Sequence, residues 1–233
     1  MQKIRRSEER GQRNYGWLDA RYTFSFGEYF DPAHVQFGNL RVLNQDRVER
    51  GRGFPTHGHR DMEIVTYVLD GLLEHKDSMG HGSEIRPGDV QLMSAGTGVT
   101  HSEYNGSADE PLHLLQMWVL PRTGGTEPRY EQKHFPRAER QGALKLVVSP
   151  DGADGSLTIG QDARMYLGLF DAGERATLEL TPNQQAWIHV ARGRLRVGNV
   201  ELGPGDGLGI SDEPTLTLEG LAPAELILWQ LDP

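Results

Sequence analysis

The sequence contains no cysteine. This absence excludes disulfide bonds, iron-sulfur clusters, thiolate metal ligands and cysteine nucleophiles together. Any metal site in this protein must therefore be built from histidine, carboxylate and water ligands.

Long apolar segments and basic clusters are missing as well. No stretch approaches the roughly 18 consecutive apolar residues of a membrane span, and the first twenty residues lack the apolar core of a secretion signal. We therefore expect a cytoplasmic protein that makes no membrane contact. The 24 lysines and arginines are outnumbered by 33 aspartates and glutamates, which leaves a net charge of -9. Direct binding of nucleic acid, which relies on neutralising phosphates, is not expected.

The chain is rich in turn residues and poor in helical periodicity. Its 29 glycines and 13 prolines separate short runs of strand-forming residues, such as 63–69, 112–120 and 226–231. No long stretch repeats apolar residues at the 3.6-residue period of a helix. The sequence predicts an all-β protein whose sheets form closed barrels or sandwiches, an arrangement that protects sheet edges.

A weak internal repeat suggests two related halves. In the first half, a strand followed by Gly71 leads to a Pro-Gly-Asp turn at 87–89, and in the second a strand followed by Gly193 leads to the same turn at 204–206. Proline sets φ and glycine accepts a positive φ in such turns. Two related barrels are therefore predicted.

The predicted linker between the barrels lies in residues 121–142, where glycines, prolines and charges interrupt the strand pattern. We place the boundary near residue 135. The predicted domains are an N-terminal barrel of residues 1–135 and a C-terminal barrel of residues 136–233.

Four candidate metal ligands occur as two pairs with the same spacing, His57-x-His59 and His101-x-Glu103. Residues two apart on a strand point to one face, so neighbouring strands would bring the four side chains together. Three neutral imidazoles and one carboxylate suit Fe(II), Mn(II), Ni(II), Co(II), Cu(II) or Zn(II). With nine histidines in the chain, one such pair can arise by chance. The residues around the pairs are therefore needed to decide whether they bind a metal.

The glycine context of these pairs resembles the two sequence motifs of the cupin superfamily. The motifs read Gly51-x5-His57-x-His59-x3-Glu63 and Gly98-x2-His101-x3-Asn105. More specifically, the runs 51–67, 86–91 and 94–103 are similar to the pirin family, and the similarity extends over essentially the whole chain. The resemblance implies two tandem cupin barrels, of the double-stranded β-helix or jelly-roll type. It also implies that the N-terminal barrel holds the metal and that the C-terminal barrel has no metal site.

The identity of the acidic ligand has two interpretations. General cupins take it from the first motif, which would nominate Glu63, whereas the pirin pattern matches Glu103. Strand alternation keeps Glu63 in phase with His57 and His59 unless a bulge intervenes, so phase does not exclude it. The resemblance favours His57, His59, His101 and Glu103 as the metal ligands, with Glu63 as a neighbour that supports them or forms an ion pair.

Some pirins act as quercetin 2,3-dioxygenases, which cleave the flavonol heterocycle with O2 and release carbon monoxide. The resemblance therefore implies a metal-dependent dioxygenase that takes a flavonol and O2, with Fe(II) expected first among the candidate metals and a monomeric state. Glu103 would be the catalytic base that accepts the flavonol 3-hydroxyl proton. The alternative is a metal-binding, redox-sensing regulatory protein that acts through protein contacts, as described for animal pirin.

The other histidines are given structural roles. Five are expected to lack an in-phase acidic or histidine partner and not to bind metal: His34, His75, His81, His113 and His134. His189, alone on an apolar strand, is expected to be a hydrogen-bonded core residue. Trp118 is expected to pack in the core rather than to line a substrate pocket.

Overall fold

The structure, a computed structural model, describes residues 1–232. Strands account for 59% of the residues and helices for 4%, which confirms the all-β prediction. The helical elements are the single turns η1 (Ser7–Glu9), α1 (Arg137–Arg140) and η2 (Ala153–Gly155). Within this part of the chain, no helix has the length and apolar character needed to cross a membrane.

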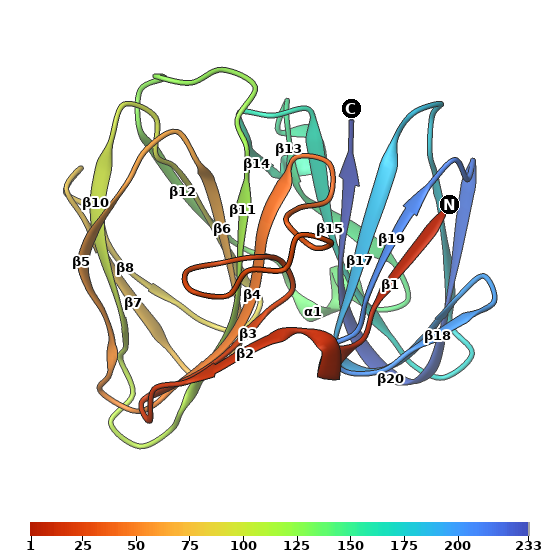
Figure 1. The fold of residues 1–233 in the computed structure, drawn as a ribbon, viewed down its shortest axis with the longest axis horizontal. Helices are drawn as coiled ribbons and strands as arrows, with labels where there is room; N and C mark the ends of the chain where they lie inside the picture. The colour runs from red at the N-terminus through yellow and green to blue at the C-terminus, as the bar shows by residue number, and fades with distance from the viewer. Residues whose placement is uncertain (233) are drawn as a thin grey trace.

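Two antiparallel sheets form the first half of the molecule (Figure 1). The larger has seven strands in the order β12 (Arg129–His134), β9 (Asp89–Ser94), β6 (Glu63–Asp70), β11 (Leu112–Val119), β4 (Leu40–Val48), β3 (Leu18–Tyr22) and β2 (Gly11–Asn14). The smaller has the order β5 (Gly53–His59), β10 (Val99–Asn105), β7 (Leu73–Asp77) and β8 (Gly82–Ile85). The apolar side chains between the two sheets form the interior of this half.

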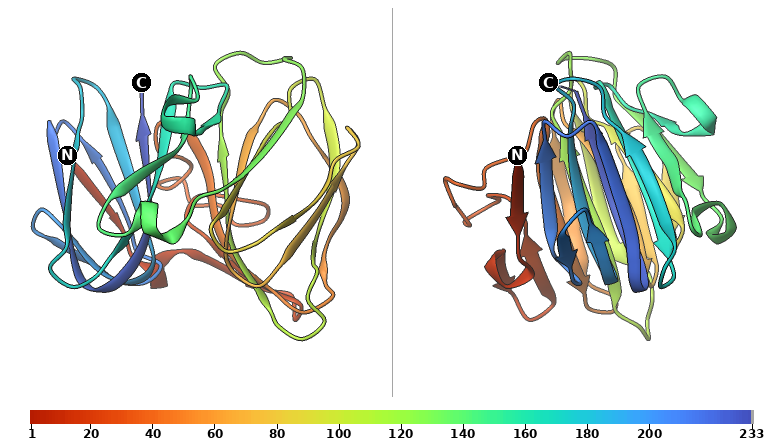
Figure 2. Two further views of the ribbon diagram at one scale, coloured as in Figure 1. Left: turned by 180° about the vertical axis from the view of Figure 1, so that it is seen from behind. Right: turned by 90° about the vertical axis from the view of Figure 1, so that its right-hand side faces the viewer.

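A nine-stranded sheet forms the second half. Its main path runs through β1 (Gln2–Arg5), β19 (Gly207–Ser211), β17 (Gln185–Val197), β20 (Thr215–Leu231), β15 (Ala163–Phe170), β13 (Leu144–Ser149) and β14 (Leu157–Thr158). Strand β16 (Arg175–Glu179) pairs with β20, and β18 (Val200–Leu202) pairs with β17. The connection that carries α1 and η2 crosses between the halves on the side facing the viewer in the left view of Figure 2.

One strand departs from the predicted division into residues 1–135 and 136–233. Strand β1 pairs with β19 of the second half, from Gln2 opposite Ile210 to Arg5 opposite Gly207. An unpaired sheet edge exposes backbone N–H and C=O groups, and β1 satisfies this one. The first residues therefore belong structurally to the second barrel, while the boundary near residue 135 stays a prediction.

The two halves share a hydrophobic core. One cluster of buried side chains combines residues of the first half, such as Phe24 and Met117, with Trp187 and Trp229 of the second. The Phe24 and Trp187 rings lie 4.9 Å apart between centroids, and the Trp229 indole N–H donates to Met117 Sδ at 3.3 Å. The outer face of the seven-stranded sheet thus packs directly on the second half.

Strand alternation gives the seven-stranded sheet two different faces around its centre. In β11, Leu115, Met117 and Val119 belong to the core shared with the second half, while Gln116 and Trp118 line a pocket inside the first half. Because successive side chains on a strand point to opposite faces, one sheet separates two distinct environments. Both environments contain polar side chains, as described below.

Candidate metal centre

Three histidine side chains converge inside the first half. Strands β5 and β10 are antiparallel neighbours, with His57 directly opposite His101 and His59 opposite Val99. The Nε2 atom of His101 lies 3.1 Å from Nε2 of His57 and 3.0 Å from Nε2 of His59. The structure therefore brings together the three histidines that the spacing predicts.

A bulge in β5 lies next to the paired histidines and displaces the partner of Glu103. The register shifts between His101 and Glu103, so that Glu103 faces Phe54 instead of Pro55. Proline cannot donate a hydrogen bond to a neighbouring strand and is tolerated at such irregularities. The His57 ring donates from Nδ1 to the Pro55 carbonyl at 2.8 Å, which leaves the Nε2 lone pair pointing toward the other two rings.

The histidine cluster favours neutral rings. Burial, together with the charge of His57, lowers the pKa of His59 to about 4. Burial and the neighbouring His57 and His59 lower the pKa of His101 to about 3. These two imidazoles are therefore neutral at pH 7, which is the form that binds a metal.

The geometry of the three nitrogens fits a metal ion. His101 Nε2 lies within hydrogen-bond distance of two ring nitrogens and can donate to at most one of them. Three imidazole nitrogens held this close together form a donor set that suits a divalent transition-metal ion.

Glu103 lies deep beside this cluster. Its carboxylate is 3% exposed and accepts hydrogen bonds from Nε2 of Gln116 at 2.9 and 3.2 Å. Burial raises the pKa of Glu103, although the Gln116 hydrogen bond and the charge of His57 oppose the shift. Its ligand atoms fall within 4.8 Å of those of His75 and His101, so His101 is common to two candidate metal-binding groups.

His75 is a member of the site that the sequence prediction dismissed. It sits directly opposite Glu103 across β7 and β10, and its ring stacks on Tyr130 with 4.9 Å between centroids. The expectation that it lacks an in-phase acidic partner is wrong, because Nε2 lies 3.1 Å from Oδ2 of Asp77. The His75-x-Asp77 spacing is the same two-residue signal that identified the other pairs.

The four other histidines of this set also contact carboxylates, although not as in-phase neighbours on one strand. The partners are Asp31 for His34, Asp77 for His81, Asp70 for His113 and Asp89 for His134. None of these four histidines belongs to a group with metal-binding geometry in residues 1–232. Their carboxylate partners come mostly from turns or other strands, so strand phase alone could not reveal them.

A largely apolar pocket of about 340 Å³ opens onto the histidines. This volume lies at the lower end of the range of about 300–1,000 Å³ that is typical of small-molecule sites. Its walls are Leu18, Ala20, Tyr22, Phe26, Phe54 and Trp118, with Asn44, Asp46 and Gln116 as polar members. Trp118 packs against a buried apolar cluster, as expected, but it also lines the pocket, and its ring meets His59 edge-on at 4.9 Å.

Glu63 lies on the wrong face to support the histidines. It begins β6, whose alternate residues Val65, Tyr67 and Leu69 belong to the core shared with the second half. Its Oε2 accepts a hydrogen bond from the Ser94 hydroxyl at 2.8 Å, and Oε1 lies close to Gly160. The turn before β6, with Asp61 at φ 64, moves the chain from the small sheet to the large one and breaks the strand phase.

The second half, as far as the structure describes it, contains no group of three potential ligands in metal-binding geometry. His189 is fully buried there, as expected for a core residue. Neither of its ring nitrogens has a hydrogen-bond partner, however, so the expected hydrogen bond is not found. Burial lowers the pKa of His189 well below its usual value, and the ring is therefore uncharged.

Comparisons with known proteins identify the family of this chain. The family model named Pirin matches residues 3–119, and the model of the quercetinase C-terminal cupin domain matches residues 146–231. This chain belongs to the pirin family. The two matches, together with the observed sheets, confirm the predicted tandem cupin barrels.

Individual members of the pirin family are similar over nearly the full length. A protein of Escherichia coli named quercetin 2,3-dioxygenase is 44% identical over 99% of this chain and 98% of its own length. A pirin-like protein of Caulobacter vibrioides is 40% identical over 94% of each chain. The solved structure of the bacterial pirin YhhW of E. coli, in complex with nickel(II), has a TM-score of 0.96 at 44% identity and covers both chains completely.

Proposed function

We propose that this pirin is a metal-dependent dioxygenase that cleaves a flavonol such as quercetin with O2 and releases carbon monoxide. The observation that carries the proposal is the convergence of three histidine Nε2 atoms beside an apolar pocket that His57 and His59 line. The 44% identity to a protein named quercetin 2,3-dioxygenase supports the same reaction. Hydrolytic chemistry has no comparable support from the comparisons.

The proposed metal ligands are His57, His59, His101 and Glu103. A divalent ion held there would supply positive charge that lowers the pKa of a substrate hydroxyl group and orients it. The nickel complex of the related bacterial pirin supports a divalent transition metal. Fe(II) remains our first candidate on the sequence resemblance, with Ni, Co, Mn, Cu and Zn as alternatives.

The pocket walls suit a flat aromatic substrate. Tyr22, Phe26, Phe54 and Trp118 line the cavity, and aromatic side chains favour stacked or edge-on contacts with another ring. A flavonol that fills the pocket would displace water from the neighbourhood of the histidines, which would strengthen electrostatic interactions there. We assign to them the positioning of the flavonol rings.

Glu103 is the proposed proton acceptor. Burial raises its pKa, so its carboxylate is a stronger base than one in water, and the Gln116 amide holds both of its oxygens. We propose that it takes the proton of the flavonol 3-hydroxyl group. The electron-rich flavonolate would then react with O2 while the walls hold it in place.

The test compares two buried glutamates. Glu103→Gln removes the proposed base, whereas Glu63→Gln makes the same change on the opposite face of the first barrel's wall. With metal-loaded protein and quercetin in air, we expect loss of flavonol absorbance and release of carbon monoxide. Turnover should fall about 100-fold or more in Glu103→Gln and stay near the wild-type rate in Glu63→Gln. Unchanged turnover in Glu103→Gln would reject the assignment of the base.

Metal exchange separates the proposed enzyme from the redox-sensing alternative. A redox sensor needs an ion that cycles between two oxidation states, whereas a flavonolate can itself supply electrons to O2. We expect protein reconstituted with Ni(II) or Co(II) to retain turnover. Metal-loaded wild-type protein that releases no carbon monoxide from quercetin, whatever the metal, would overturn the proposed reaction.

A further inference from the structure

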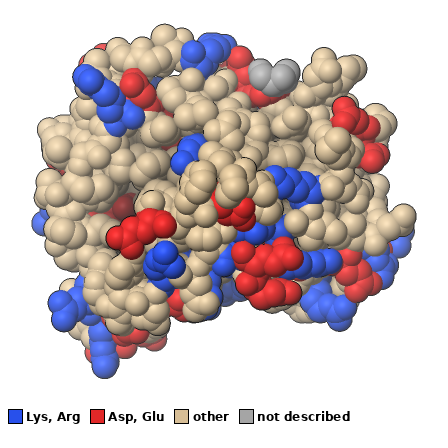
Figure 3. All heavy atoms as spheres, in the orientation of Figure 1, with Lys and Arg blue, Asp and Glu red and all other residues tan. Residues whose placement is uncertain are grey.

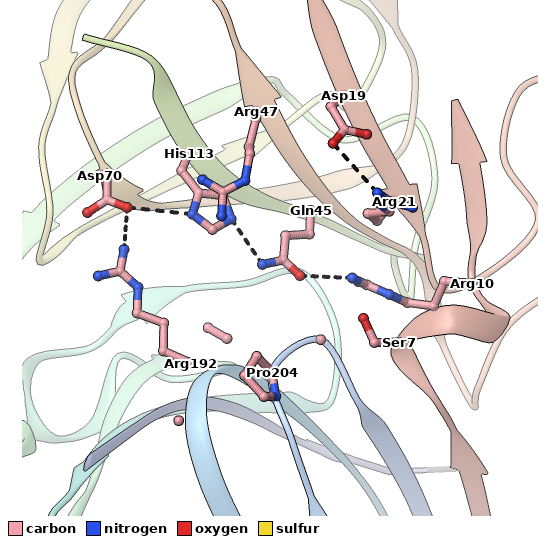
Figure 4. Close-up of a pocket in the computed structure, with 13 residues that line it drawn as sticks. Ser7, Arg10, Asp19, Arg21, Gln45, Arg47, Asp70, His113, Arg192 and Pro204 are labelled. Carbon is pink, nitrogen blue, oxygen red and sulfur yellow. Dashed lines mark hydrogen bonds and ion pairs between the residues drawn. The ribbon is translucent and has the colours of Figure 1, made fainter. Parts of the chain in front are cut away.

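A second, larger cavity lies on the opposite face of the sheet that walls the metal pocket. Its volume is about 500 Å³, and it lies between the two halves of the molecule (Figure 4). Strand β4 serves both cavities: Asn44 and Asp46 line the metal pocket, while Gln45 and Arg47 line the second cavity. Alternation along one strand thus gives each face its own site.

Arginines dominate the charge of this cavity. Arg10, Arg21 and Arg47 come from the N-terminal half and Arg192 comes from β17. Charged side chains of both signs gather around the lower part of the junction between the halves (Figure 3). The whole chain carries a net charge of -9. A cavity lined by four arginines therefore differs in sign from the charge of the protein as a whole.

Two of these arginines form ion pairs with aspartates that also line the cavity. Arg21 lies 3.6 Å from Asp19, and Arg192 lies 2.5 Å from Asp70. Among the ion pairs of residues 1–232, none includes Arg10 or Arg47. The lining holds four arginines and two aspartates, so it carries an excess of two positive charges. Asp46 and Asp206, which are not part of the lining, attract Arg10 without forming an ion pair with it.

Arg10 is the decisive residue. Its side chain lines the cavity but is only 6% exposed. Nη2 donates to Oε1 of Gln45 at 3.0 Å, whereas Nε and Nη1 are buried with no hydrogen-bond partner. Leaving donors of a buried charged group unpaired is costly, and a guanidinium with free N–H groups is the side chain best suited to hold an anion.

A chain of polar contacts through Gln45 and His113 holds Arg10 in place (Figure 4). The Gln45 amide accepts from Arg10 and points Nε2 at His113 Nε2, 3.0 Å away. The other His113 nitrogen lies 3.6 Å from Asp70. Since burial and the charges of Arg47 and Arg192 lower the pKa of His113 to about 4, His113 is a neutral acceptor that orients Gln45 and adds no charge.

We propose that this cavity binds a small anion that carries a carboxylate or phosphate group. Arg10 and Arg47 of the first half and Arg192 of the second would contact it from different sides. Such a ligand bridges the two barrels, so its binding stabilises their junction by mass action. The site is separate from the metal centre, because the β3–β4–β11 part of the sheet lies between the two cavities.

Calorimetric titration of the full-length, metal-loaded protein tests the proposal with two probes, inorganic phosphate and succinate, in matched chloride buffer. Arg47→Gln removes a cavity charge, and Arg50→Gln removes an exposed charge close in sequence that does not line the cavity. We expect Arg47→Gln to weaken binding of the preferred probe about 10-fold or more, and Arg50→Gln to change it less than twofold. Preference for phosphate or for succinate identifies the source of the anionic group.

Thermal unfolding provides a second readout. Saturating anion should raise the Tm of the wild-type protein by about 5 °C or more. In Arg10→Met this anion-dependent rise should disappear while metal affinity stays at the wild-type level, which shows an intact first barrel. The proposal is overturned if neither probe binds below about 10 mM, or if the Arg47 and Arg50 variants weaken binding equally, as expected for an adventitious ion only. Quercetin turnover is measured separately, so its failure would leave this result unaffected.

Discussion

The hydrogen bonds between Gln116 and Glu103 allow a quantitative test of the proposed metal ligands. Gln116 Nε2 contacts both carboxylate oxygens at 2.9 and 3.2 Å, and Glu103 itself is buried. A hydrogen bond to a charged group contributes about 1.5–3 kcal/mol. Since about 1.4 kcal/mol corresponds to a tenfold change, Gln116→Leu should weaken metal binding about 10- to 100-fold. Side chains that orient metal ligands in other proteins have effects of the same size.

The matched control for this experiment is Gln230→Leu. Gln230 is a buried glutamine, 7% exposed, whose Nε2 donates to Gln184 at 2.7 Å in the second half. Both variants lose a side-chain hydrogen bond, so both should be less stable, but only Gln116→Leu should lose metal affinity. Competition between each protein and a chromophoric chelator for Ni(II) at pH 7 measures the difference. Wild-type affinity in Gln116→Leu would refute the role of Glu103 as a ligand held by Gln116.

Three further changes test other parts of the reasoning. Burial and the charge of Glu103 raise the pKa of Asp46 to about 8, so the folded state retains a proton that the unfolded state releases near pH 4. The free energy of unfolding of the wild-type protein therefore falls as the pH rises. In urea unfolding of metal-free protein between pH 5 and 7, the free energy of unfolding of Asp46→Asn should rise relative to the wild-type value by up to about 1.4 kcal/mol per pH unit. A difference that does not depend on pH would contradict a protonated Asp46 carboxyl group. Trp229→Ala, at the fully buried junction of the halves, should reduce the free energy of unfolding by about 3–5 kcal/mol within one transition, and two separate transitions in circular dichroism would argue against a shared core. Because the pKa values of His59 and His101 are about 4 and 3, chelator competition should detect metal binding at pH 5, and release with a midpoint near pH 6.5 would contradict the neutral cluster.

Local patterns in the sequence were sufficient for the fold class and the centre of the site. Turn residues between short alternating runs predict an all-β chain, because the strand period and turn chemistry are local properties. The two-residue spacing of His57 and His59 predicts a shared face for the same reason. The pirin resemblance added the tandem barrels and the choice of Glu103 over Glu63.

Pairing between strands decided which neighbours complete that site. His75 joins it because β7 places it opposite Glu103, and Gln116 reaches the same carboxylate from β11 in the other sheet. Glu63, in phase along the sequence, faces the second half because the chain changes sheets between β5 and β6. The positions of these three side chains depend on the register between strands or on the turn between β5 and β6. Neither the register nor the turn can be deduced from the spacing of residues along one strand.

The junction of the two halves depends on the tertiary structure alone. Arg10, Arg47 and Arg192 are far apart in the sequence and share no motif, so composition showed only an acidic chain. Strand β1 crosses to the second sheet, and the two barrels then pack through Trp187 and Trp229. The chemistry of each side chain and the alternation along a strand are local properties of the sequence. The cationic cavity arises where two sheets from different parts of the chain pack together, and local spacing does not encode that packing.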